Sequence, residues 1–102
     1  MININVSTSG PVATIHMNGR FDFNAHRSFK EACDPLLQQK GVSSIEINLS
    51  GVEYMDSSAL GMLLLLRERA ETEGKAVALV RPNTTLMQIL DIANFKKLFP
   101  IR

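Results

Sequence analysis

The stretch Asp56-Ser57-Ser58-Ala59-Leu60-Gly61 decides the fold because of the sequence on either side of it. Before it, residues 44–49 alternate polar and apolar side chains, which is the period of a half-buried strand. After it, residues 62–66 are apolar without a break, and residues 67–71 turn polar with helix-forming side chains. The pattern predicts a strand that leads through a turn into a helix, and this helix opens with an acid and two hydroxyl groups.

Ser57 stands where an added anion would be stabilised. The first backbone N–H groups of a helix have no partner inside the helix, and the macrodipole adds partial positive charge there. A phosphate on Ser57 would therefore be well held. Spacing alone also fits a purely structural explanation, because Ser and Asp are favoured as helix caps. Asp56 is expected to be the N-cap, and it could also orient the Ser57 hydroxyl or bind a partner's metal ion during phosphoryl transfer.

Further segments of the chain have the patterns of strands. Residues 2–6 and 12–17 alternate polar and apolar side chains on either side of a turn signal, which predicts a hairpin. Ser50-Gly51 predicts a bulge or a turn after the strand at 44–49. Residues 76–80 are continuously apolar, as in an interior strand covered on both faces. Residues 95–101 predict a short closing strand at a sheet edge.

The first helix is predicted to begin at Asn24 as its N-cap. Its apolar face recurs at helical spacing through Phe29, Ala32, Cys33, Leu36 and Leu37. Pro35 removes one helical hydrogen bond, which predicts a kink near Glu31 or an end to the first half of the helix there. Gly41 is expected to stop the helix.

Two more helices complete the pattern. The helix that starts at Ser57 is predicted to run to about Glu73, with Gly74 as its C-terminal cap. An amphipathic helix begins near Thr84 or Thr85 and is marked by Leu86, Ile89, Leu90 and Ala93. The order β-β-α-β-α-β-α-β favours a single α/β domain over residues 1–102, with a mostly parallel or mixed central sheet.

The composition of the chain argues against a nucleic-acid-binding, a secreted or a membrane-spanning protein. A chain of 102 residues has room for one domain, and a net charge of +1 without Trp gives no electrostatic footprint for nucleic acid or a membrane surface. Cys33 is the single cysteine, which suits a reducing compartment. Residues 1–4 lack the features of a signal peptide, and the apolar run 60–66 is too short to span a bilayer. We therefore expect a cytoplasmic protein.

The sequence predicts neither catalysis nor a bound cofactor. A serine hydrolase elbow has the pattern Gly-x-Ser-x-Gly, whereas Met55-Asp56-Ser57-Ser58-Ala59 has neither glycine. The chain has no Gly-rich phosphate loop with its lysine. His16 and His26 lack Cys or acidic companions at ligand spacing, so no metal site is expected.

The apolar run after the serines has two explanations. Residues 62–66 contain more apolar side chains than one buried stripe requires. Either the helix is packed deeply in the core, or its outward members form a partner surface made of Leu60, Met62 and Leu64. Both explanations stay open on sequence alone.

The segment Val52-Glu53-Tyr54-Met55-Asp56-Ser57-Ser58-Ala59-Leu60-Gly61 resembles the signature of the STAS domain, in the branch of the anti-sigma factor antagonists. Met17-Asn18-Gly19-Arg20-Phe21-Asp22 resembles the family's early strand and its Gly-x-x-Asp turn. Leu90-Asp91-Ile92-Ala93-Asn94-Phe95, with Leu98-Phe99, resembles its last helix and final strand. The chain departs from the family pattern at Ala59 and Asn94, where the family often has Gly.

The resemblance implies a phosphorylation-controlled binding module. In this family the unphosphorylated protein binds a serine kinase that is also an anti-sigma factor, and so frees a sigma factor. The kinase phosphorylates the first serine after the aspartate, which is Ser57 here, with Ser58 as the fallback. A PP2C-type phosphatase restores binding, and we expect the free protein to be a monomer.

The resemblance also implies helices largely on one side of the sheet and a turn at Asp22 that lies near the serine and helps to bind the partner. A plain turn acid explains Asp22 almost as well. An alternative function for the same fold is a constitutive subunit of a signalling scaffold, or of lipid or anion transport machinery, without a serine switch.

Overall fold

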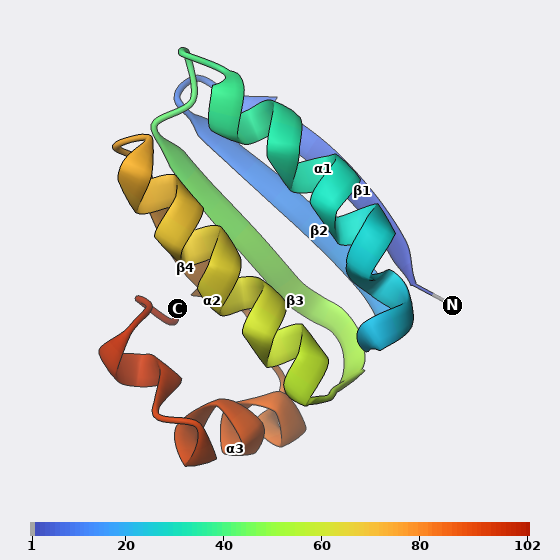
Figure 1. Cartoon of the computed structure of the whole chain (residues 1–102). Coiled ribbons are helices and arrows are strands. Elements are labelled where there is room, and N and C mark those ends of the chain that lie inside the picture. Colours follow the sequence, from blue (N-terminus) through green and yellow to red (C-terminus); the bar gives the residue numbers. More distant parts are fainter. Residues whose placement is uncertain (1) are drawn as a thin grey trace.

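The structure is a computed structural model that describes residues 2–102, so that Met1, among the N-terminal residues considered above, lies outside the described part. A four-stranded sheet has the order β1-β2-β3-β4, and two helices lie side by side across one of its faces (Figure 1). The strands are β1 Asn3–Ser9, β2 Val12–Phe21, β3 Ser44–Met55 and β4 Ala76–Val80. The α-helices are α1 His26–Gln38, α2 Ser57–Thr72 and α3 Thr84–Ile92.

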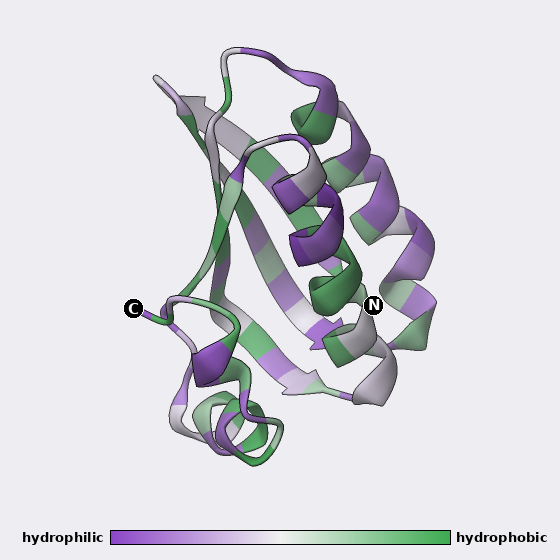
Figure 2. Ribbon diagram, turned by 60° about the vertical axis from the view of Figure 1, so that its left-hand side comes forward, coloured by the Kyte–Doolittle hydropathy of each residue, from purple (hydrophilic) through white to green (hydrophobic). Residues whose placement is uncertain are grey.

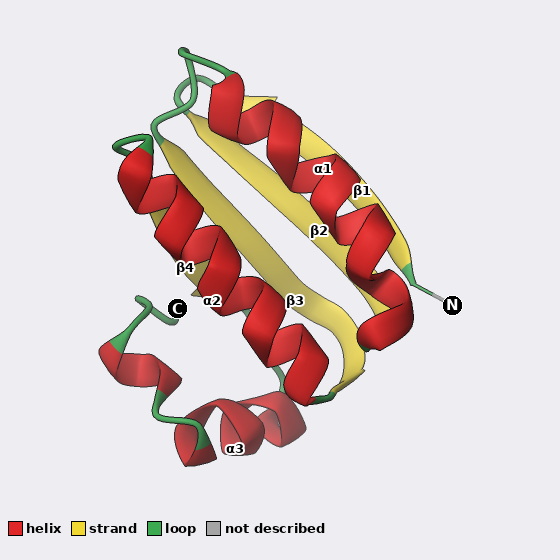
Figure 3. Ribbon diagram, in the orientation of Figure 1, coloured by secondary structure: helices red, strands yellow, loops and turns green. Residues whose placement is uncertain are grey.

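The sheet is mixed, as predicted (Figure 3). β1 and β2 form an antiparallel hairpin, whereas β2 pairs with β3, and β3 with β4, in parallel. α1 and α2 cover one face, and α3 lies with the C-terminal segment on the opposite side of the sheet (Figure 2). The α/β class, the mixed sheet and the placement of most helices on one side are therefore confirmed.

One part of the core lies between the sheet and the helices α1 and α2, and Leu86 and Leu90 of α3 are buried as well. Every second side chain in the first part of β2 and of β3 is at most 1% exposed. These residues are Ala13, Ile15 and Met17 on β2 and Ile45, Ile47 and Leu49 on β3. From α1, the ring of Phe29 lies 5.1 Å from that of Phe21 at the end of β2. Because alternate side chains of a strand point to the same face, the apolar residues at every second position form one buried face of the sheet.

β3 continues beyond its predicted end at residue 49. Between the pairs His16–Asn48 and Asn18–Gly51, β3 advances three residues while β2 advances two, so the predicted bulge at Ser50-Gly51 is confirmed. Pairing resumes after this bulge and carries β3 to Met55. A Cβ at Gly51 would lie 3.0 Å from the backbone oxygen of Met17 and would overlap the exposed side chain of Asn18, which then has to move.

The predicted start of the first helix is wrong. Asp22, and not Asn24, is the capping residue, and it caps the short 3₁₀ helix η1 Phe23–Ala25 from which α1 follows directly. Pro35 lies inside α1 without ending it, because the missing N–H affects one bond while Leu36 and Leu37 remain anchored in the core. The helix ends at Gln38, before Gly41, where the backbone becomes extended.

Two predictions about the C-terminal half of the chain are wrong: the position of β4 in the sheet and the closing strand at residues 95–101. β4 is the last strand of the sheet and not an interior one, although Val77, Ala78 and Leu79 are all buried. The segment 95–101 is not a strand: it forms the 3₁₀ helix η2 Phe95–Lys97 and meets β4 through one parallel bridge, between Leu79 and Ile101. Phe95 and Phe99 explain the difference, because their rings stack at 5.3 Å with the spacing of a helical turn.

Candidate functional site

Asp56 caps the helix that carries the two serines. Its Oδ1 accepts a hydrogen bond of 2.9 Å from the backbone N–H of Ala59, which confirms the predicted N-cap. Ser57 is the first residue of α2 and is exposed, and Ser58 beside it is half-buried. The hydroxyl of Ser57 is therefore presented to solvent at the positive end of a 16-residue helix.

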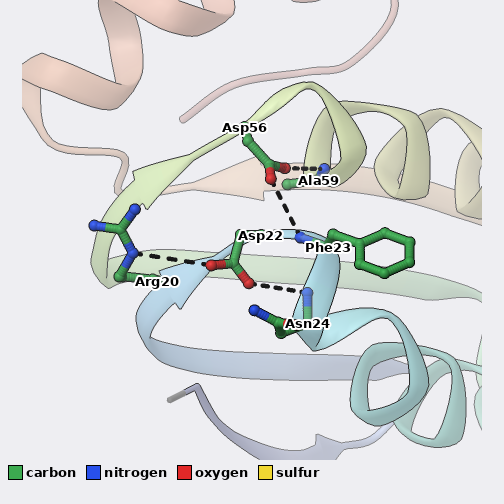
Figure 4. Close-up of polar contacts among 6 residues, drawn as sticks. All are labelled: Arg20, Asp22, Phe23, Asn24, Asp56 and Ala59. Atoms are coloured by element: carbon green, nitrogen blue, oxygen red, sulfur yellow. Dashed lines mark hydrogen bonds and ion pairs between the residues drawn. The ribbon is translucent and has the colours of Figure 1, made fainter.

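The turn at Asp22 docks directly onto this helix start. Oδ2 of Asp56 accepts a hydrogen bond of 3.2 Å from the backbone N–H of Phe23, and the N–H of Asp56 donates to the carbonyl of Phe21 at 3.4 Å. Asp22 accepts from the N–H of Asn24 at 3.0 Å (Figure 4). The predicted proximity of the Asp22 turn to the serine is confirmed.

Both carboxylate oxygens of Asp56 are thus occupied by backbone donors, one from its own helix and one from η1. This arrangement ties the end of β2 to the end of β3 and leaves Asp56 as a positioning group in the free protein. Its second predicted role, in phosphoryl transfer, stays a prediction.

Arg20 and Tyr54 form a contact that the sequence analysis missed. The guanidinium group of Arg20 lies 4.5 Å from the centre of the Tyr54 ring, and its Nε lies 3.9 Å from Oδ2 of Asp22. The two residues are cross-strand partners of β2 and β3. Because a register shift separates Gly19 from Arg20, only the folded register brings them together.

The outward surface of α2 differs from the predicted partner surface. Met62 is 7% exposed and belongs to the core, so its assignment to the outward face is wrong, and Leu60 is only half-buried. Leu64 and Leu65 are 38% and 51% exposed. Both explanations of the apolar run therefore hold in part: one side of the helix is buried and two leucines face solvent.

Phe23 is a further exposed apolar residue, in the segment whose backbone contacts Asp56. Its side chain is 69% exposed, while its backbone N–H is held by Asp56. Figure 4 shows the ring directed away from both aspartates. An exposed aromatic side chain on a fixed backbone is a favourable anchor for a protein partner.

The two histidines lie on different elements, His16 on β2 and His26 on α1. His16 contacts the hydroxyl of Ser7 at 3.2 Å on the sheet, and His26 is exposed at the start of α1. Over residues 2–102, no three His, Cys, Asp or Glu side chains gather as a metal site requires. Within the same range, no helix is both long and apolar enough to cross a bilayer.

Comparison with known proteins identifies the family. The family model described as "Mlab, STAS domain" matches residues 4–100. The chain belongs to the STAS domain family. A STAS-domain containing protein of Pseudomonas aeruginosa (strain UCBPP-PA14) is 40% identical to this STAS protein over 97 residues, which cover 93% of this chain and 92% of the relative.

Two solved structures share the STAS fold. The crystal structure of an anti-sigma factor antagonist from Mycobacterium paratuberculosis has a TM-score of 0.87 at 20% identity and covers 99% of this chain and 85% of that one. The structure of the Bacillus cell fate determinant SpoIIAA in its phosphorylated form has a TM-score of 0.75 at 18% identity, covering 98% of this chain and 91% of that one.

Proposed function

We propose that this STAS protein is an anti-sigma factor antagonist whose binding is controlled by phosphorylation of Ser57. The unphosphorylated protein binds an anti-sigma factor that is also a serine kinase, and thereby releases a sigma factor. The kinase transfers phosphate from ATP to Ser57, and the complex dissociates. A PP2C-type phosphatase removes the phosphate and restores binding.

The exposed position of Ser57 at the start of α2 carries the proposal. A partner can reach the hydroxyl without unfolding the helix, and the product phosphate meets free N–H groups and the positive end of the macrodipole. The similarity in fold to an anti-sigma factor antagonist, and to SpoIIAA in a phosphorylated form, supports this assignment.

The chain acts in this scheme as substrate and ligand and not as an enzyme. Both carboxylate oxygens of Asp56 hold backbone amides and so fix the start of α2, and the kinase supplies the catalytic groups for phosphoryl transfer. We assign Asp22, Ser58 and the exposed Phe23, whose backbone N–H contacts Asp56, to the proposed partner surface. The protein remains a cytoplasmic monomer when it is free.

The proposal is tested by reconstitution. Affinity capture on the Ser57→Ala variant identifies the kinase, which is then purified. Size-exclusion chromatography should show a complex between the kinase and the unmodified protein, and this complex should dissociate when ATP and Mg²⁺ are added. The Ser57→Ala complex should persist under the same conditions. A complex that persists in the unmodified protein after complete phosphorylation would contradict the proposal and favour a constitutive subunit of a scaffold or transport assembly.

A further inference from the structure

An apolar hollow lies between α1 and α2, the two helices that run side by side in Figure 1. Its volume is about 60 Å³, enough for the end of one apolar side chain. The floor consists of the buried residues Phe29 and Cys33 of α1 and Met62 and Leu66 of α2. Leu65, which is 51% exposed, forms its lip.

The rim of the hollow is basic. His26, Lys30 and Arg69 line it, and the side chains of Lys30 and Arg69 are 55% and 38% exposed. Lys30 and Arg69 both pair with Asp34, each at 2.8 Å. Because one carboxylate faces two cations, one positive charge on this rim is not neutralised.

The hollow begins close to the proposed switch. Met62 follows Ser57 by little more than one helical turn. Gly61, between them, is exposed, and a Cβ built at this position meets no atom within 4 Å. A partner segment can therefore approach the backbone of α2 at Gly61 while it contacts both Ser57 and the hollow.

We propose that the hollow receives an apolar side chain of the protein partner, carried on a segment with acidic residues beside that side chain. The apolar floor favours burial of an aliphatic or aromatic group. The unneutralised charge of the rim favours carboxylates on either side of it, and it disfavours a basic segment. The identity of the partner rests on the proposed function: it is the kinase that phosphorylates Ser57.

Substitution at the lip tests the apolar contact. Leu65→Asp puts a negative charge over the hollow, and isothermal titration with the purified kinase should show binding weakened about tenfold or more. The control is Ile92→Asp, because Ile92 is 85% exposed on α3, across the sheet from the hollow, and its affinity should equal that of the unmodified protein. Thermal unfolding of both variants checks that each remains folded.

The charge of the rim is tested separately by salt dependence. Affinity for the kinase should fall as NaCl rises from 50 to 500 mM, and this fall should be smaller in Lys30→Gln, by about the effect of one charge contact. Lys97→Gln, on η2, is the control and should show the same fall as the unmodified protein. Equal affinity of Leu65→Asp and the unmodified protein, or an unchanged salt slope in Lys30→Gln, would overturn the inference and leave the serine switch intact. Failure of the unmodified protein to bind the kinase would instead refute the proposed function, and this inference with it.

Discussion

A phosphate on Ser57 would experience two opposing electrostatic effects. The helix start attracts it, because the first N–H groups of α2 have no partner within the helix. The carboxylate of Asp56 repels it, although that charge is shared with two backbone donors, from Ala59 and Phe23. The balance favours a stable phosphoprotein, since the serine is exposed and water screens the repulsion.

Site-directed variants test the choice of serine. With the kinase and ATP, the unmodified protein should gain one phosphoryl group, and Ser57→Ala should gain none because the exposed hydroxyl is gone. Ser58→Ala is the matched control and should be modified normally, since Ser58 is half-buried one residue further into α2. Intact-protein mass spectrometry measures the addition. Phosphate that persists in Ser57→Ala, or appears only on Ser58, would contradict the assignment.

At the scale of elements, two glycines should respond in opposite ways to the same substitution. Gly61→Ala should raise the free energy of unfolding by about 0.5–1 kcal/mol, because the new methyl group has open space and alanine favours a helix. Gly51→Ala should lower it by about 1 kcal/mol, because the methyl group would lie 3.0 Å from the backbone oxygen of Met17 and would displace the exposed side chain of Asn18. Urea unfolding measures both values. A destabilised Gly61→Ala would show that Gly61 has a role in the free fold.

The contact between α1 and α2 should make stability depend on pH. The hydrogen bond from Lys30, together with Arg69, lowers the pKa of Asp34 below its ordinary value. A lowered pKa in the folded state adds stability at neutral pH that is lost as the pH falls through that pKa. Asp34→Asn should therefore be less stable than the unmodified protein at pH 7, and the difference should shrink below about pH 4.

The control for this prediction is Glu31→Gln, which removes an exposed carboxylate from the same helix. Its difference from the unmodified protein should stay small across the range. Urea unfolding between neutral and acid pH measures both variants. A constant difference for Asp34→Asn would mean that the Asp34 ion pairs do not contribute to stability.

Local sequence patterns predicted most helices and strands, and tertiary contacts explain where the predicted bounds and types of element were wrong. The bounds of β4 and the cap at Gly74, with a φ of +72°, follow from short-range preferences. The continuation of β3 to Met55 depends on a bulge that keeps it paired with β2, which the alternation of residues 44–49 does not contain. The segment 95–101 was misassigned because aromatic stacking between Phe95 and Phe99 outweighs its strand propensity.

For the whole molecule, parallel pairing of β2 and β3 brings the site together. The carboxyl ends of parallel neighbours lie at the same end of a sheet, so Asp22 after β2 and Asp56 after β3 meet although they are far apart in sequence. The resemblance to the STAS family implied this proximity. The hollow between α1 and α2, and the contact of Arg20 with Tyr54, depend on packing and on a shifted register, which no local pattern encodes.

Phosphorylation should change the affinity for the partner while it leaves the fold in place. The modification adds about 1.5 to 2 negative charges, and docking over Ser57 must remove water from them. Burial of an unpaired charge costs several kcal/mol, so binding of the phosphorylated protein to the kinase should be weaker by roughly a hundredfold, or about 3 kcal/mol. The thermal midpoint should stay equal or rise slightly, because the helix dipole stabilises the phosphate by about 0.3–1 kcal/mol.

Four forms of the protein decide between a partner switch and a constitutive interaction. Isothermal titration against the kinase should give full affinity for the unmodified protein and for Ser57→Ala, and the weakest binding for the phosphorylated protein. Ser57→Asp should lie between them, because its single charge sits on a shorter arm than the phosphate. Equal affinities of the phosphorylated and unmodified forms would exclude the switch. A cooperative loss of structure on phosphorylation would show instead that release proceeds through unfolding and not through desolvation of the phosphate.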